Sequence, residues 1–228
     1  PIKRYFHLSS DHLEPVYIPR YIDALRRWKP TFVHAFPSAI YPLARWLADH
    51  PAPEVTQRIR AIQLFSENVY DYQVDLLERV FRCPVLLDYG LSERTAKAVS
   101  RPRDKRYFFW PLYGHVELID LAGQPVKEPG RTGELVTTAF DNRAMPLIRY
   151  RTGDLATLSG KPNEIFPGFL AVDRIEGRLQ EFIVCRDSRL VSITTIGVAH
   201  LDALAFAKYM QFEQRTPGQV VLKVVSDT

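Results

Sequence analysis

The fold of this chain is decided by residues 31–89, which read TFVHAFPSAIYPLARWLADHPAPEVTQRIRAIQLFSENVYDYQVDLLERVFRCPVLLDY. Three short apolar runs have the length and composition of buried strands, and two segments between them carry apolar residues three and four positions apart, as amphipathic helices do. The apolar runs are 31–35, 61–65 and 84–89, and the helical segments are 38–47 and 72–81. Alternation of strand and helix predicts a parallel sheet with crossover helices.

Helices are also predicted on both sides of this stretch. The spacing of apolar residues predicts a helix over 17–28, which Pro30 would end. Ser38 has the chemistry of an N-cap for the helix that follows the first strand. After the third strand, a short helix is expected over 92–99, beginning at Ser92.

The predicted topology locates a candidate site before any motif is considered. In open parallel sheets, ligands bind at the carboxyl ends of the strands. In this chain those ends are followed by residues 36–38, 66–68 and 89–93. We therefore expect these three segments to converge on one cleft.

The second half of the chain has a different pattern of short strands separated by turn residues. Strands are predicted over 106–113, 115–120, 134–140 and 146–150, with turns at 122–124, 128–130 and 151–154. This pattern predicts an antiparallel region, barrel-like or sandwich-like. A small third piece follows, with strands over 181–185, 190–193 and 219–225 and a helix over 197–207.

Composition excludes several classes of protein. With 46% hydrophobic and 25% charged residues, the chain is an ordinary globular protein, neither collagen-like, coiled-coil nor disordered. No run approaches the roughly 18 apolar residues of a membrane span, so no membrane insertion is expected. Two cysteines cannot form a disulfide framework or a four-cysteine zinc site, which favours a reducing cytoplasm. A net charge of +4 with scattered basic residues gives no reason to expect a nucleic-acid partner.

The first motif that could carry chemistry is 88–93, Asp-Tyr-Gly-Leu-Ser-Glu. Gly90 permits a tight turn or a close approach of backbone to ligand, and Tyr89 offers a flat face for a base. Ser92 would present a hydroxyl and free N–H groups at a helix N-terminus, and Glu93 is an oxygen ligand suited to Mg²⁺. An N-cap serine with a first-turn glutamate that complements the helix dipole explains the same residues equally well.

The second motif is 145–154, Met-Pro-Leu-Ile-Arg-Tyr-Arg-Thr-Gly-Asp. On a strand, Arg149 and Arg151 would share one face. Asp154 follows a Thr-Gly turn, where its carboxylate could accept a pair of ribose hydroxyls. Taken alone, the pattern favours a surface hairpin with an Asx turn.

The third motif is 174–178, Arg-Ile-Glu-Gly-Arg, at the change of organisation. Gly177 would be a turn or hinge glycine, and Arg178 a contact to phosphate or ribose. By itself, a surface-loop arginine is the simpler interpretation.

The order and spacing of these motifs are more specific than any one of them. Together, 66–67, 89–93, 149–154 and 175–178 resemble the adenylate-forming superfamily, most closely its phenylacetate–CoA ligase, CapK and coenzyme F390 synthetase-like branch. The resemblance covers about residues 15 to 225. It implies an α/β fold with a ligase-type large domain, followed by part of a small α+β domain. The implied division is a parallel β/α nucleotide-binding subdomain at 1–105, an antiparallel barrel-like subdomain at 106–178 and the small domain at 179–228.

The resemblance also implies roles for individual residues. The backbone of 66–68 and of 89–90 would flank the adenine of ATP or AMP, next to Asp88. Ser92 would hold the α-phosphate, Glu93 would hold Mg²⁺, and Asp154 would bind the ribose hydroxyls with help from Arg178. The implied nucleotide-binding residues are therefore Ser66, Glu67, Asn68, Asp88, Tyr89, Gly90, Ser92, Asp154 and Arg178, with Ser92 and Glu93 catalytic and His34, Phe36, Pro37 and Ser38 lining the acyl pocket.

The implied reaction is the activation of a carboxylic acid, with an aryl acid as one candidate. The acid would attack the α-phosphorus of ATP, and the acyl adenylate would then pass to a thiol such as coenzyme A. The family's phosphate loop would lie upstream of Pro1, so we expect this chain to be a fragment of such an enzyme, with an incomplete C-terminal domain. Two alternatives stay open. One is adenylyl transfer to a phenolic acceptor, and the other is a non-catalytic ligand-binding module, because Gln180 stands where the family usually has aspartate.

Overall fold

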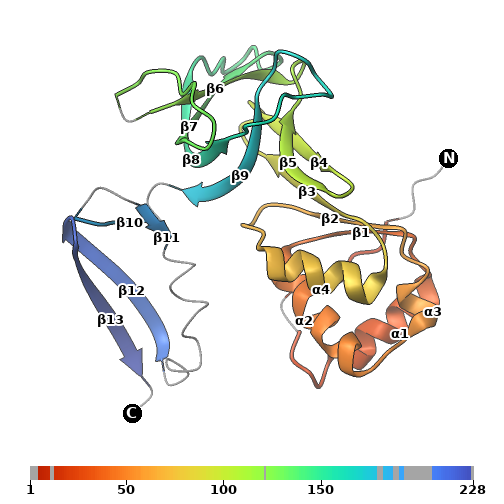
Figure 1. Ribbon diagram of the computed structural model, residues 1–228. Helices are drawn as coiled ribbons and strands as arrows, with labels where there is room; N and C mark the ends of the chain where they lie inside the picture. The colour runs from red at the N-terminus through yellow and green to blue at the C-terminus, as the bar shows by residue number, and fades with distance from the viewer. Residues whose placement is uncertain are drawn as a thin grey trace.

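A computed structural model describes residues 5–10, 13–120, 122–178, 182–186, 190–192 and 207–226 (Figure 1). The helices are α1 (Ile18–Trp28), α2 (Pro37–Asp49), α3 (Pro53–Thr56) and α4 (Asp71–Phe81). The strands of the first half are β1 (Phe32–Ala35), β2 (Ala61–Leu64), β3 (Val85–Gly90), β4 (Lys97–Arg101) and β5 (Asp104–Phe109). Those that follow are β6 (Gly114–Ile119), β7 (Thr132–Ala139), β8 (Tyr150–Leu158), β9 (Ala171–Arg178), β10 (Phe182–Val184), β11 (Leu190–Ser192), β12 (Ala207–Thr216) and β13 (Gln219–Ser226). None of the helices in these ranges is both long and apolar enough to cross a membrane.

A single nine-stranded sheet organises most of the molecule. Its strand order is β1-β2-β3-β4-β5-β9-β8-β7-β6. Strands β1, β2 and β3 pair in parallel, and every later pair is antiparallel. The parallel and antiparallel regions expected from the sequence are therefore confirmed, and they share one sheet. Two separate hairpins, β10–β11 and β12–β13, follow β9.

The helices gather on one side of the parallel strands (Figure 1). Their apolar faces are buried against the inward side chains of β2 and β3, as the spacing in the sequence predicts. This core includes Ile22, Leu47, Leu77 and Phe81 from the helices and Ile62 and Leu64 from β2. Since the helices cover one face and cross over between parallel strands, the carboxyl ends of β1, β2 and β3 lie along one edge.

The prediction of a helix over 92–99 is wrong. Residues 92–94 form a turn in which the N–H of Arg94 bonds the carbonyl of Leu91, and Arg94 has a φ of 58°. The chain then forms β4, whose residues alternate between half-buried and buried and pair with β3 and β5. The serine and glutamate are a good helix start locally, but pairing on both sides of 97–101 outweighs that preference.

The prediction of a strand over 146–150 is also wrong. Arg149 has a φ of 50°, which is incompatible with an extended strand, so β8 begins only at Tyr150. As a result, Arg149 and Arg151 do not lie together on a strand face. The turn expected at 151–154 lies inside β8, where Gly153 at a φ of 76° accommodates a bulge opposite β7.

Two smaller expectations also need correction. Ser38 is not the N-cap of α2, because Phe36 occupies that position and Pro37 begins the helix. The missing N–H and fixed φ of proline suit the first helical position. In the C-terminal part, β10, β11 and β13 match predicted strands, and β12 was missed. The helix expected over 197–207 lies outside the described residues except for Ala207, which begins β12.

Candidate functional site

A cleft of about 660 Å³ opens where β3, β8 and β9 meet the loop after β2. Its walls come from the start of α2, the loop and helix start at 66–73, the end of β3 with Leu91, Tyr107 of β5, Asp154 of β8 and the end of β9. The lining residues are Ser38, Ser66, Glu67, Asn68, Tyr70, Tyr72, Gln73, Asp88, Tyr89, Gly90, Leu91, Tyr107, Asp154, Ile175, Gly177 and Arg178. Of the fourteen residues singled out in the sequence, nine line this cleft, and His34, Phe36, Pro37, Ser92 and Glu93 do not.

Tyr89, Asp154 and Arg178 form one contact group in the cleft. The Tyr89 hydroxyl donates a hydrogen bond of 2.6 Å to Oδ2 of Asp154, and the Arg178 guanidinium lies 3.7 Å from Oδ1. Asp154 and Arg178 are directly opposite residues of β8 and β9, so the sheet register itself brings them together. Burial, followed by the charge of Asp154, raises the pKa of Tyr89, which stays protonated and acts as a donor.

Glu93 extends from the turn after β3 to the start of β8. Its Oε1 accepts a hydrogen bond of 2.9 Å from the hydroxyl of Tyr150, and this bond is the main cause of a raised pKa at Tyr150. The charges of Arg178 and Asp154 also act on Tyr150, so the glutamate is close to the contact group around Asp154. Ser92 is exposed in the same turn. Because no helix begins there, an anion at Ser92 would not have a helix dipole to stabilise it.

The loop at 66–68 is fixed to α2 by a side chain. Ser66 has a φ of 62°, a left-handed conformation that is uncommon for a residue with a Cβ. Glu67 accepts hydrogen bonds from the backbone N–H of Ser38 at 2.8 Å and from its hydroxyl at 2.7 Å. Since neither Phe36 nor Pro37 can cap the helix with a side-chain oxygen, Glu67 serves as the cap from outside α2. The Glu67 carboxylate is therefore bound by the protein and not turned to a ligand.

We expect Glu67→Ala to lower the free energy of unfolding by about 1 kcal/mol, the usual effect of removing a helix cap. Urea unfolding followed by circular dichroism would measure it. Glu67→Gln should lose less, because its amide oxygen can still accept the Ser38 N–H bond. Equal losses in both variants would contradict a capping role.

Asp88 also has protein partners. Its side chain is only 7% exposed and forms an ion pair with Lys97 of β4, while the amide of Gln63 on β2 donates to its other oxygen. This network links three strands just before Tyr89 and Gly90. It supports the floor of the cleft rather than leaving a free carboxylate there.

The residues expected to line an acyl pocket form an aromatic stack beside the cleft. The rings of His34 and Phe36 lie 3.9 Å and 4.6 Å from that of Phe65, which follows β2. Burial is the main cause of a lowered pKa at His34, which favours the neutral imidazole. Pro37, the first residue of α2, is buried. Phe65 was missed in the sequence, although its place at the end of a strand beside 66–68 was a usable signal.

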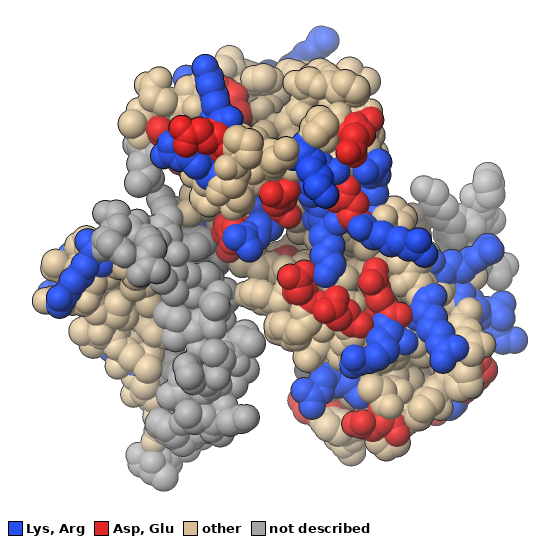
Figure 2. All heavy atoms as spheres, in the orientation of Figure 1, with Lys and Arg blue, Asp and Glu red and all other residues tan. Residues whose placement is uncertain are grey.

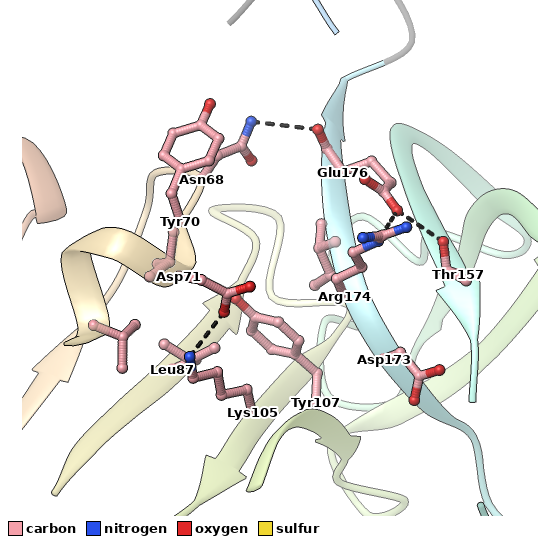
Figure 3. Close-up of a pocket in the computed structure, with 13 residues that line it drawn as sticks. Asn68, Tyr70, Asp71, Leu87, Lys105, Tyr107, Thr157, Asp173, Arg174 and Glu176 are labelled. Carbon is pink, nitrogen blue, oxygen red and sulfur yellow. Dashed lines mark hydrogen bonds and ion pairs between the residues drawn. The ribbon is translucent and has the colours of Figure 1, made fainter. Parts of the chain in front are cut away.

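A second cavity of about 560 Å³ adjoins the cleft (Figure 3). The two share Asn68, Tyr70, Tyr107 and Ile175. The wall is held by a bond of 3.4 Å from the Asn68 amide to the carbonyl of Glu176. Four of its charged side chains form two pairs, Lys105 with Asp71 at 2.8 Å and Arg174 with Glu176 at 2.6 Å. Sequence reasoning missed this cavity because its walls come from five separate elements, α4, β3, β5, β8 and β9, and from the loop before α4.

The charges on the molecule are mixed. On the face shown in Figure 2, acidic and basic side chains are interspersed, with no continuous basic area among the residues drawn in colour. Within the described ranges, no group of three or more histidine, cysteine, aspartate or glutamate side chains is placed to hold a metal ion. A cation at Glu93 would therefore need further ligands from a bound molecule.

Comparisons with known proteins find relatives of this chain by sequence and by fold. No family model matches the chain. The chain is 24% identical to protein CapK of Staphylococcus aureus over 197 residues, covering 84% of this chain and 41% of that protein. It is 25% identical to phenylacetate-coenzyme A ligase of Pseudomonas putida over 191 residues, covering 79% and 43% respectively. The chain thus spans less than half the length of these curated relatives.

Solved structures share the fold. A 2-hydroxyisobutyryl-CoA ligase in complex with an AMP adduct superposes with a TM-score of 0.67 at 16% identity, covering 92% of this chain and 46% of that one. The anthranilate CoA ligase AuaEII in complex with anthranoyl-AMP gives a TM-score of 0.59 at 12% identity, covering 91% and 41%. By sequence, this chain is similar to CapK and to phenylacetate-coenzyme A ligase, and it shares its fold with CoA ligases solved in complex with AMP adducts.

Proposed function

We propose that this chain is the nucleotide-binding part of a ligase that uses ATP to activate a carboxylic acid as an acyl adenylate. The acyl group would then pass to a thiol, coenzyme A being the acceptor named for the relatives. The observation that carries the proposal is the convergence of Asp154, Arg178, Tyr89 and the loop 66–68 on one cleft. Residues from four distant parts of the sequence meet there, at the strand ends where open sheets bind ligands.

Each part of a nucleotide would find a matching group in this cleft. The carboxylate of Asp154 can accept both hydroxyls of a ribose, and Arg178 beside it can reach a ribose or phosphate oxygen. The backbone of 66–68 and of 89–90 would lie along the base. Ser92 would bind the α-phosphate from the turn. The acid would lie against His34, Phe36 and Phe65, whose stacked rings favour a flat, aryl substrate.

Glu93 is suited to hold Mg²⁺ together with the phosphates. Tyr150 occupies one of its oxygens, and among the described residues the other accepts no hydrogen bond. Mg²⁺ binds with one or two carboxylates plus phosphate oxygens, so a single glutamate fits its requirements. When bound, the ion would neutralise charge that develops on the phosphoryl oxygens.

We also propose a cytoplasmic location and the three-part division at 1–105, 106–178 and 179–228. The cysteines Cys83 and Cys185 are both unpaired, in keeping with a reducing compartment. Burial raises the pKa of Cys83 to about 11, which suits a packed and unreactive thiol.

Thermal unfolding tests the nucleotide proposal directly. AMP should raise the melting temperature of the 228-residue chain, and saturation at 100 times the dissociation constant corresponds to about 2.7 kcal/mol of added stability. Asp154→Ala should lose most of this shift, while Asp23→Ala on the exposed side of α1 should keep it. No shift in the wild type, or an equal shift in Asp154→Ala, would contradict the proposal. Pyrophosphate exchange by the longer protein separates catalysis from binding alone.

A further inference from the structure

Four polar side chains form a row on the face of the parallel strands that is turned away from the helices (Figure 1). His34 of β1 and Gln63 of β2 are directly paired in the sheet, so their side chains lie on the same face. The Gln63 amide donates a hydrogen bond to one oxygen of Asp88 on β3. The ammonium of Lys97 on β4 donates to the other oxygen, so the row crosses four strands.

This row adjoins the aromatic stack against which the acid is proposed to lie. The rings of His34 and Phe65 are 3.9 Å apart. Burial is the main cause of the lowered pKa of His34, and the charges of Asp88 and Lys97 also act on it, in opposite directions. Lys97 is paired with Gly90 of the cleft lining, and a Cβ on Gly90 would lie 3.8 Å from its Nζ. The ion pair therefore lies beside both the stack and the cleft.

The ammonium of Lys97 is within reach of a ligand. Its side chain is 31% exposed, whereas that of Asp88 is buried. Among the described residues, Nζ donates a hydrogen bond only to Asp88, and an ammonium has three N–H groups. Asp88 keeps its two donors and still has lone pairs beside the ammonium, because a carboxylate offers about four.

The pair favours a neutral group that both donates and accepts hydrogen bonds. A second carboxylate on the acid would gain from the ammonium of Lys97 but would be repelled by the carboxylate of Asp88, and a cationic group would meet the reverse conflict. A hydroxyl meets neither, because its oxygen can accept from Lys97 while its hydrogen points to Asp88. Sites that bond a substrate hydroxyl discriminate against the analogue that lacks it.

We propose that Lys97, held in place by Asp88, determines which acid the chain selects, and that this acid is a hydroxylated aryl acid. Its ring would lie against His34 and Phe65, with the ring hydroxyl bonded to Lys97. This assignment rests on the proposed function and names the substrate class of its acid site. It gives the ion pair a role in specificity besides its support of the cleft floor.

Binding of acyl-adenylate mimics by the 228-residue chain tests this assignment. Calorimetry would compare AMP, 5′-O-(N-benzoylsulfamoyl)adenosine and the three counterparts that carry a 2-, 3- or 4-hydroxybenzoyl group. At least one hydroxybenzoyl ligand should bind the wild type about tenfold more tightly than the benzoyl ligand, the effect of one hydrogen bond to a charged group. In the double variant Asp88→Ala with Lys97→Met, this ratio of affinities should fall to within about twofold of one.

The matched control removes an ion pair elsewhere in the chain. Arg26→Met with Glu54→Ala, which separates α1 from α3 outside the cleft lining, should keep the tenfold ratio. If circular dichroism shows that the double variant at 88 and 97 does not fold, Lys97→Met alone replaces it, with the same loss of the ratio expected.

The other outcomes separate this assignment from the proposed function. Equal binding of the benzoyl and all hydroxybenzoyl ligands by the wild type overturns the role of Lys97 and leaves the proposed function standing. A preference that survives the loss of the ion pair does the same, as does binding of AMP without binding of any mimic. If the wild type binds neither AMP nor a mimic, the proposed function fails, and the role of Lys97 fails with it.

Discussion

Asp88→Ala is expected to lower the free energy of unfolding by about 3 kcal/mol, the lower end of the range for breaking a buried ion pair from one side. The Asp88 side chain is 7% exposed and that of its partner Lys97 is 31% exposed. Removing the carboxylate leaves the Lys97 ammonium partly buried without a counter-charge and deprives the Gln63 amide of its acceptor. Urea unfolding of the two proteins at neutral pH would measure the difference.

A double variant identifies the source of that loss. Asp88→Ala combined with Lys97→Met removes both charges, and it should recover a large part of the stability because no unpaired ion remains. If Asp88→Ala costs less than about 1 kcal/mol, the pair behaves as an exposed surface contact and does not support the cleft floor. Because Asp88 precedes Tyr89, the single variant should also weaken AMP binding.

Phe81→Ala is expected to have a similar or larger effect, a loss of about 3–5 kcal/mol. Phe81 is the last residue of α4 and is 1% exposed in the core between the helices and the parallel strands. The substitution removes a large side chain from a packed interior and leaves a cavity that a helix end cannot fully close. Chemical unfolding of the chain would give the value.

The same helix provides the control for Phe81. Arg79 is exposed on α4, and Arg79→Ala should change stability by no more than about 0.5 kcal/mol. A loss at Phe81 as small as that at Arg79 would mean that α4 does not contribute its apolar face to the core. Since α4 follows the loop 66–70, a loosened helix should also lower affinity for nucleotides.

The local pattern was sufficient to predict most of the first half of the fold. The apolar runs over 31–35, 61–65 and 84–89 correspond to β1, β2 and β3, and the periodic segments correspond to α1, α2 and α4. Each of these elements buries one side only, so the spacing of its apolar residues along the sequence indicates whether it is a helix or a strand. The parallel topology then located the cleft at the strand ends.

The failures occur where pairing with distant strands outweighs local preference. Residues 97–101 lie between β3 and β5, and that pairing forms a strand although Ser92 and Glu93 resemble a helix start. At 146–150 a left-handed Arg149 delays the strand, and the apparent turn at Gly153 is a bulge within β8. The sequence of a short segment does not show which distant strands that segment will pair with.

The sequence by itself determined the α/β class, the order of the elements in the parallel region and a list of candidate nucleotide-binding side chains. Only the tertiary structure decided what each side chain does. It bonds Glu67 to Ser38 and Asp88 to Lys97, and it leaves Asp154 and Arg178 at the cleft with Tyr89 across from them. The physical reason is that periodicity and turn chemistry act over a few residues. What a carboxylate binds, by contrast, depends on the donors packed against it, and one donor to Asp154, the hydroxyl of Tyr89, is 65 residues away in the sequence.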